Sequence, residues 1–153
     1  MAEITVAQAL IASTAVSAYS AMQQGKYAAA AAQAEQQQYE EDKRLAKLQA
    51  LEDANERKRE MLASESANRA LFAVKTGADP RESASFLALR DANEASAERD
   101  IGTIRLMGAA TNRKYNLSIW NSGLEARAAK TAGYTKAATT MLGGYIDYRK
   151  ATG

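Results

Sequence analysis

Between Tyr27 and Val74 the chain alternates polar and apolar residues in a helical pattern, with no Gly or Pro. Ala, Gln, Glu, Lys, Arg and Leu dominate this stretch, and they are the strongest helix formers. At 1.5 Å per residue it would form a helix about 70 Å long, more than the diameter of a compact domain of this size. A helix this polar gains little stability alone. The pattern therefore predicts a long helix over 26–76 that packs in a bundle.

Apolar residues recur along this helix with a period of 11 positions, which favours a nearly straight or slightly right-handed bundle. Coincidence within an ordinary amphipathic helix is the alternative, and a heptad fits less well because Asn55 and Arg59 fall at its apolar positions. Lys47, Lys58 and Arg69 follow the same period on another line. The apolar positions, which predict oligomer packing, include Tyr39, Ala50, Met61 and Phe72, with Leu51 and Leu62 one residue later.

The middle of the helix is strongly charged, since thirteen of the twenty-one residues in 40–60 are Asp, Glu, Lys or Arg. Several opposite charges stand four residues apart, for example Asp53 and Arg57, in the order that stabilises a helix. Such a surface is either solvated or lines a water-filled lumen. The charge pattern leaves both arrangements open.

Residues 1–25 predict a separate N-terminal helix rich in Ala and Ser, without a charge between positions 4 and 24. Its small residues recur four apart, which permits close approach of another helix. It is either an Ala-rich helix buried in an oligomer or a segment that enters a membrane once several copies assemble. Gly25 is expected to end it. The candidate membrane or ring contacts here are Leu10, Ile11, Val16 and Tyr19.

A turn is predicted at 77–80. Gly77 suits the left-handed position after a helix C-terminus. Asp79 and Pro80 suit the N-cap and first position of a following helix, and Glu82 completes a capping box. The turn folds the second helix back along the first, so the predicted fold is an all-α, elongated hairpin of long helices, ordered in a homo-oligomeric ring or bundle.

The second long helix is predicted over 80–129, with a bend expected near 102–108 because of its two glycines. Residues 130–153 form a small-residue tail, in which Gly143-Gly144 is expected to break any helix. The tail is either a terminus that docks on a neighbour or a segment whose tyrosines meet a membrane surface. Candidate oligomer contacts of the helix are Ile104, Tyr115 and Trp120, and the candidate membrane or ring contacts of the tail are Tyr134 and Tyr145.

Composition excludes several classes of function. The chain has no Cys and no His, which removes thiolate nucleophiles, imidazole acid–base chemistry and the usual zinc sites. No phosphate-binding glycine loop is present. Its net charge of +2 gives no footprint for sequence-specific nucleic-acid binding. The sequence therefore predicts a protein that is not an enzyme and needs no cofactor or metal.

The order of segments resembles that of the small internal virion proteins, or ejection proteins, of short-tailed bacteriophages. An uncharged Ala/Ser-rich start precedes a charged helix, a Gly-containing loop and a second helix. A Tyr-Asn step follows, with an aromatic residue after it, and the chain closes in an Ala- and Gly-rich C-terminus. The matching positions are Gly77, Tyr115, Asn116 and Trp120.

The resemblance implies a structural role. Several copies would sit in the virion, in the capsid interior, at the portal or in the tail lumen, and leave with the genome. In the host cell envelope they would help form an oligomeric conduit. The implied partners are copies of the chain, other virion proteins of the portal, tail or internal core, and the host membrane. The alternatives are an architectural tail or connector component that stays in the particle, and a cytosolic coiled-coil adaptor.

Overall fold

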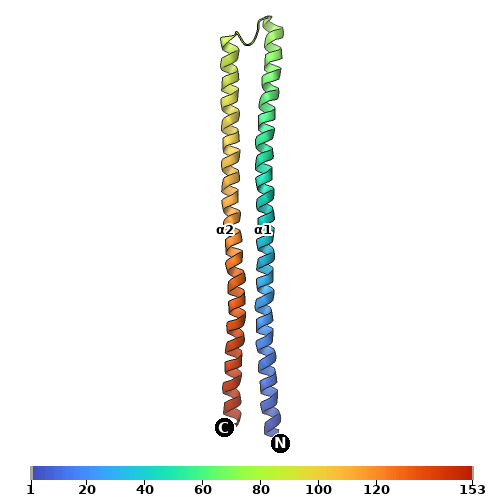
Figure 1. Cartoon of the computed structure of the whole chain (residues 1–153), viewed down its shortest axis with the longest axis vertical. Helices are drawn as coiled ribbons and strands as arrows, with labels where there is room; N and C mark the ends of the chain where they lie inside the picture. The colour runs from blue at the N-terminus through green and yellow to red at the C-terminus, as the bar shows by residue number, and fades with distance from the viewer. Residues whose placement is uncertain (1, 153) are drawn as a thin grey trace. The chain divides into compact units, whose positions relative to one another are not determined.

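The chain folds into two long helices. The computed structural model describes the backbone of residues 2–152 and the side chains of residues 8–150. Helix α1 spans Ala2–Thr76 and helix α2 spans Ala84–Thr152. They pack antiparallel as a hairpin, with α2 beside α1 in both ribbon views (Figure 1). The predicted all-α hairpin is confirmed.

Helix α1 is longer than predicted, because it runs through Gly25 without a break. A glycine inside a helix costs about 1 kcal/mol relative to Ala, but α2 lies directly against this position. An added methyl group at Gly25 would lie 2.7 Å from the Cα of Gly133 and 2.8 Å from the carbonyl oxygen of Ala129. The prediction that Gly25 separates two helices is wrong. It marks a close helix–helix contact instead.

The loop of residues 77–83 contains the predicted glycine. Gly77 has a φ of 65°, in the left-handed region, and its N–H donates to the carbonyl of Ala73 at 2.9 Å. The turn residues beyond it behave differently from the prediction. Asp79 Oδ1 accepts a hydrogen bond from the N–H of Arg81 at 2.9 Å, a local turn that competes with helix capping. Residues 80–82 therefore form a separate turn.

Helix α2 begins at Ala84 rather than at Pro80, and Ser83 takes the capping role expected of Asp79. The Ser83 hydroxyl oxygen accepts from the N–H of Phe86 at 3.4 Å, and its carbonyl oxygen accepts from the N–H of Leu87 at 3.0 Å. Ser is among the preferred N-cap residues because its oxygen satisfies an N–H that has no partner within the helix.

At its other end α2 continues to Thr152, so the predicted end near 129 and the break at Gly143-Gly144 are wrong. Gly144 packs against the side chain of Thr14 in α1. The helix also runs through 102–108 without interruption. Gly108 lets α1 approach closely at this point, because a methyl group on Gly108 would lie 2.9 Å from the Cβ of Ala50.

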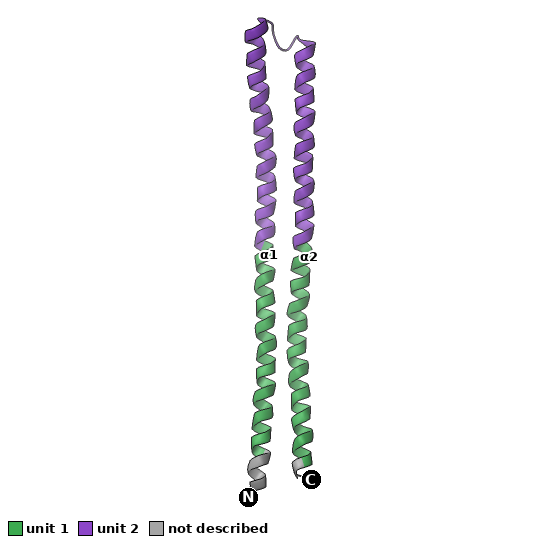
Figure 2. Ribbon diagram, turned by 180° about the vertical axis from the view of Figure 1, so that it is seen from behind, with its two compact units in different colours: residues 1–40, 116–153 green, residues 41–115 purple. Residues whose placement is uncertain are grey.

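The hairpin divides into two units (Figure 2). Unit 1 comprises residues 1–40 and 116–153, and unit 2 comprises residues 41–115. In unit 1 the facing pairs Gly25–Gly133 and Thr14–Gly144 have residue numbers that sum to 158. In unit 2 the pairs Ala50–Gly108 and Phe72–Phe86 have the same sum. The pairing therefore keeps one antiparallel register in each unit.

Small side chains form the contact between the helices of unit 1. Ala18, Ala21 and Ala137 make one buried cluster, and Ala29, Ala32 and Ala126 make a second. Ser122 is the buried polar residue of this layer, with 4% of its surface exposed. Burying Ala removes little apolar area from water, so this unit gains its contact from close approach rather than from large side chains.

Larger side chains form the contact in unit 2. The rings of Phe72 and Phe86 meet with centroids 5.3 Å apart and planes inclined by 52°. Phe86 is buried, and Ala54 and Ala97 are the buried alanines of this unit. An ion pair between the helices adds to the contact, with Arg57 Nη2 2.7 Å from Asp100 Oδ2.

The 11-residue line found in the sequence is the side of α1 that packs on α2. Tyr39, Ala50, Met61 and Phe72 are all half-buried, whereas Leu51 and Leu62, one position later, are exposed. A period of 11 keeps one side of a nearly relaxed helix turned toward its partner over many turns. The repeat thus describes packing within the hairpin.

Candidate interaction surfaces

The structure separates the residues predicted for oligomer packing into two groups. The first group is half-buried, and its members Met61, Phe72 and Ile104 lie against the opposite helix. The second group is exposed. The half-buried group is Tyr39, Met61, Phe72, Ile104 and Tyr115, and the exposed group is Leu51, Leu62 and Trp120.

The residues predicted for membrane or ring contact lie in unit 1, almost all on its outside. Leu10 is half-buried. The others expose more than half of their surface: Ile11, Val16, Tyr19, Tyr134 and Tyr145. Within the described part of the chain, neither helix has a stretch long and apolar enough to cross a membrane.

An apolar groove of about 420 Å³ brings two of these residues together in unit 1. Ile11 and Ala15 of α1 form one wall, and Met141 and Tyr145 of α2 form the other. Its floor includes Thr14 and Gly144, which pack against each other. The sequence prediction missed this groove because Gly143-Gly144 was expected to break the helix. If Gly144 is placed within a helix, its lack of a side chain predicts a gap between the larger apolar residues around it.

A second groove, of about 860 Å³, runs along the outside of α1 in unit 2. Leu48 and Leu51 provide apolar surface, and Asn55, Glu56 and Arg59 provide polar surface. Leu48 and Leu51 are 62% and 53% exposed, so water covers apolar side chains that an interface would normally bury.

The charged contacts of unit 2 lie at the surface. Arg57 Nε donates to Asp100 Oδ2 at 2.9 Å, and Arg57 Nη1 donates to Glu60 Oε2 at 3.2 Å. The bond to Asp100, followed by that to Glu60, raises the pKa of Arg57 above its ordinary value. The Arg57 guanidinium of α1 thus joins Asp100 of α2 to Glu60 of its own helix.

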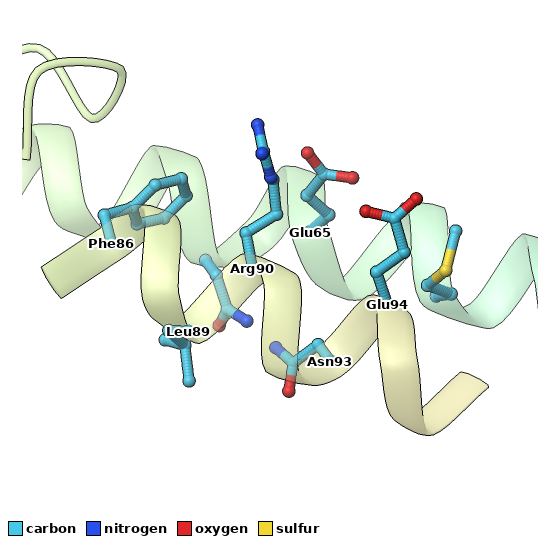
Figure 3. Close-up of a pocket in the computed structure, with 8 residues that line it drawn as sticks. Glu65, Phe86, Leu89, Arg90, Asn93 and Glu94 are labelled. Atoms are coloured by element: carbon cyan, nitrogen blue, oxygen red, sulfur yellow. The ribbon is translucent and has the colours of Figure 1, made fainter. Parts of the chain in front are cut away.

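A small cavity of about 10 Å³ lies between the helices near the loop, room for about one water. Phe86 closes one end, and Arg90 and Glu65 point to the same side, opposite Leu89 (Figure 3). A hydrogen bond to Asp91 raises the pKa of Arg90, and the charges of Glu65 and Glu94 add to this effect. The cavity is too small for an organic ligand. Among the described residues no three carboxylates lie close enough to hold a metal ion.

Comparison of this chain with protein-family models, with curated proteins and with solved structures finds no match.

Proposed function

We propose that this chain is a subunit of a homo-oligomer, and the observation that carries the proposal is its surface area. The chain exposes 11481 Å² at a mass of 16.4 kDa. A compact monomer of that mass exposes about 7,500 Å², so the excess is about 4,000 Å². A standard interface removes about 800 Å² from each partner. The excess is therefore enough for contacts with more than one neighbour.

The kind of surface exposed supports the same proposal. Among the described residues no large side chain is fully buried, and the buried residues are mostly alanines. Many of the larger apolar groups are exposed, in both units. Exposed apolar surface on this scale marks interaction sites. Examples of these groups are Leu48, Leu51, Leu62, Leu106, Met107, Leu117, Trp120, Leu142 and Ile146.

We further propose that the assembly is a virion component of a tailed bacteriophage, ejected with the genome to help form a conduit across the host envelope. Support comes from the resemblance carried by Gly77, Tyr115, Asn116 and Trp120. The absence of Cys means that no disulfide holds the hairpin closed. In unit 1 a contact layer of alanines holds the helices weakly, so these contacts can break for passage through a narrow tail and re-form afterwards.

Protein mass spectrometry on phage particles before and after triggered DNA release tests this role. The proposal expects the chain in intact particles and its loss from emptied ones, while a portal protein stays as the internal control. Retention in emptied particles would favour the architectural component. Absence from intact particles would favour the cytosolic adaptor.

Dye release from liposomes of bacterial phospholipid tests the conduit itself. Leakage is expected to rise steeply with protein concentration, because a conduit needs several copies. The variant Tyr145→Glu places a charge in the apolar groove of unit 1 and is expected to reduce leakage, whereas Lys136→Glu changes an exposed charged residue and is the control. No leakage at any concentration would contradict a conduit.

A further inference from the structure

The two sides of α1 in unit 2 carry opposite charges. The half-buried residues Ala50, Met61 and Phe72 mark the side of α1 that faces α2. Successive residues of an α-helix are about 100° apart. The residues three positions before and one position after each marker, such as Lys47 and Leu51 for Ala50, therefore lie on one flank of α1. The residues one position before and three positions after it, such as Gln49 and Asp53, lie on the other flank.

The first flank, which we name the basic flank, consists of Lys47, Lys58 and Arg69 together with Leu51 and Leu62. All five are exposed. The basic residues stand three positions before the markers, and the leucines stand one position after them. The flank thus repeats a cation and an apolar group every 11 residues.

The second flank, which we name the acidic flank, consists of Gln49, Asp53 and Glu60, with Asp42 three positions after Tyr39 on the same 11-residue line. Glu56, one turn before Glu60, lies at the outer edge of this flank. Contacts with α2 place the flank independently of the helical geometry. Gln49 and Asp53 line a groove of about 220 Å³ with α2. Glu60 shares Arg57 with Asp100 of α2, which adds a carboxylate to this side. Lys75, near the loop, is the exception to the pattern.

We propose that the copies of the assembly associate side by side in parallel through unit 2, with the basic flank of one α1 against the acidic flank of the next. Both flanks lie on the same stretch of α1, so parallel neighbours meet at the same height: Lys58 of one copy lies level with Glu56 and Glu60 of the next. Opposite charges favour this neighbour and disfavour the reverse pairing of like flanks.

Two different surfaces on each copy make this a head-to-tail interface, which closes into a ring or continues as a filament. The inference rests on the proposed homo-oligomer and deepens it by naming the pairing surfaces. In this interface the neighbouring copy buries the exposed leucines of the basic flank, Leu51 and Leu62. The basic residues beside these leucines fix the orientation of that copy.

Two charge-reversal variants of the full chain test the pairing. Variant A carries Lys47→Glu, Lys58→Glu and Arg69→Glu, so both of its flanks are acidic. Variant B carries Asp42→Lys, Asp53→Lys and Glu56→Lys, so both of its flanks are basic. Glu60 is left unchanged because it contacts Arg57. Native mass spectrometry is expected to find each variant alone as a 16.4 kDa chain and their equimolar mixture as an alternating assembly.

The matched control changes three exposed basic residues of α2 in unit 1, as Arg127→Glu, Lys130→Glu and Lys136→Glu, and is expected to assemble like the unchanged chain. Circular dichroism checks that every variant is helical. Assembly of A or B alone, or monomers in their mixture, would overturn the pairing while leaving the oligomer intact. A monomeric unchanged chain would instead overturn the proposed function.

Discussion

Units 1 and 2 use the same antiparallel register but pack in opposite ways. In unit 1 the helices approach until the backbones of Gly25 and Gly133 meet, and the contact layer is mostly alanine. In unit 2 the layer contains aromatic rings and an ion pair. We therefore expect unit 1 to be sensitive to added side-chain volume and unit 2 to removed side-chain volume.

Removing a ring from unit 2 is expected to have the largest effect. Phe86 is buried against Phe72. Phe86→Ala should lower the free energy of unfolding by about 3 kcal/mol, through lost burial and the cavity left behind. Urea denaturation followed by circular dichroism measures it at fixed protein concentration. Leu89→Ala, at a half-exposed position of the same helix, is the control and should cost much less.

The second largest effect on stability is expected from adding one methyl group to unit 1. Gly25→Ala would press on backbone atoms of α2 that cannot move independently, so a loss of about 1–3 kcal/mol is expected. Gly143→Ala is the matched control, since nothing lies within 4 Å of its added methyl group. It should instead gain up to about 1 kcal/mol from helix propensity. Equal effects of the two substitutions would contradict the close approach.

The cap of α2 should have a smaller effect, confined to the loop end of unit 2. Ser83→Ala removes the acceptor for the N–H of Phe86. Because the hydrogen bond is long, the free energy of unfolding should fall by about 0.5 kcal/mol, which is at the low end for the loss of an N-cap. Ser85→Ala, at an exposed position two residues further along in the same first turn, is the control. Hydrogen exchange of the first turn of α2 should accelerate in Ser83→Ala alone.

The ion pair of unit 2 should contribute least. Asp100→Asn leaves Arg57 with Glu60 as its partner. Because the groups are exposed, the resulting fall in the melting temperature should be small and should vanish as salt is raised. Melting curves of the variant and the unchanged chain at low and high salt measure this. A difference that persists in high salt would mean that the pair is shielded from water.

The sequence was sufficient to predict the helical hairpin and the position of its loop, because the stretch between Tyr27 and Val74 has no helix breaker and Gly77 has the right chemistry. The 11-residue line lies on the side of α1 that packs on α2, whereas it was predicted to pack on other copies of the chain. The surface that packs against this line was not predictable, because Met61 and Phe72 are apolar enough to pack on either a second copy of the chain or α2. The choice between these two partners depends on the register of the hairpin.

The glycines explain the main errors. Helix propensity treats Gly25 and Gly144 as breaks, yet each lies against the opposite helix, where a larger side chain would not fit. That contact depends on residues more than 100 positions away, such as Gly133 and Thr14, which local propensity does not include. The start of α2 was misplaced for a local reason, since the Asp79 side chain bonds within the turn.

Sedimentation equilibrium combined with thermal melting over a range of protein concentrations tests most directly whether this hairpin needs neighbours to be stable. If it does, the particles should be several times heavier than the 16.4 kDa chain, with a melting temperature that rises with protein concentration. A 16.4 kDa species that melts cooperatively at a temperature independent of concentration would contradict this expectation.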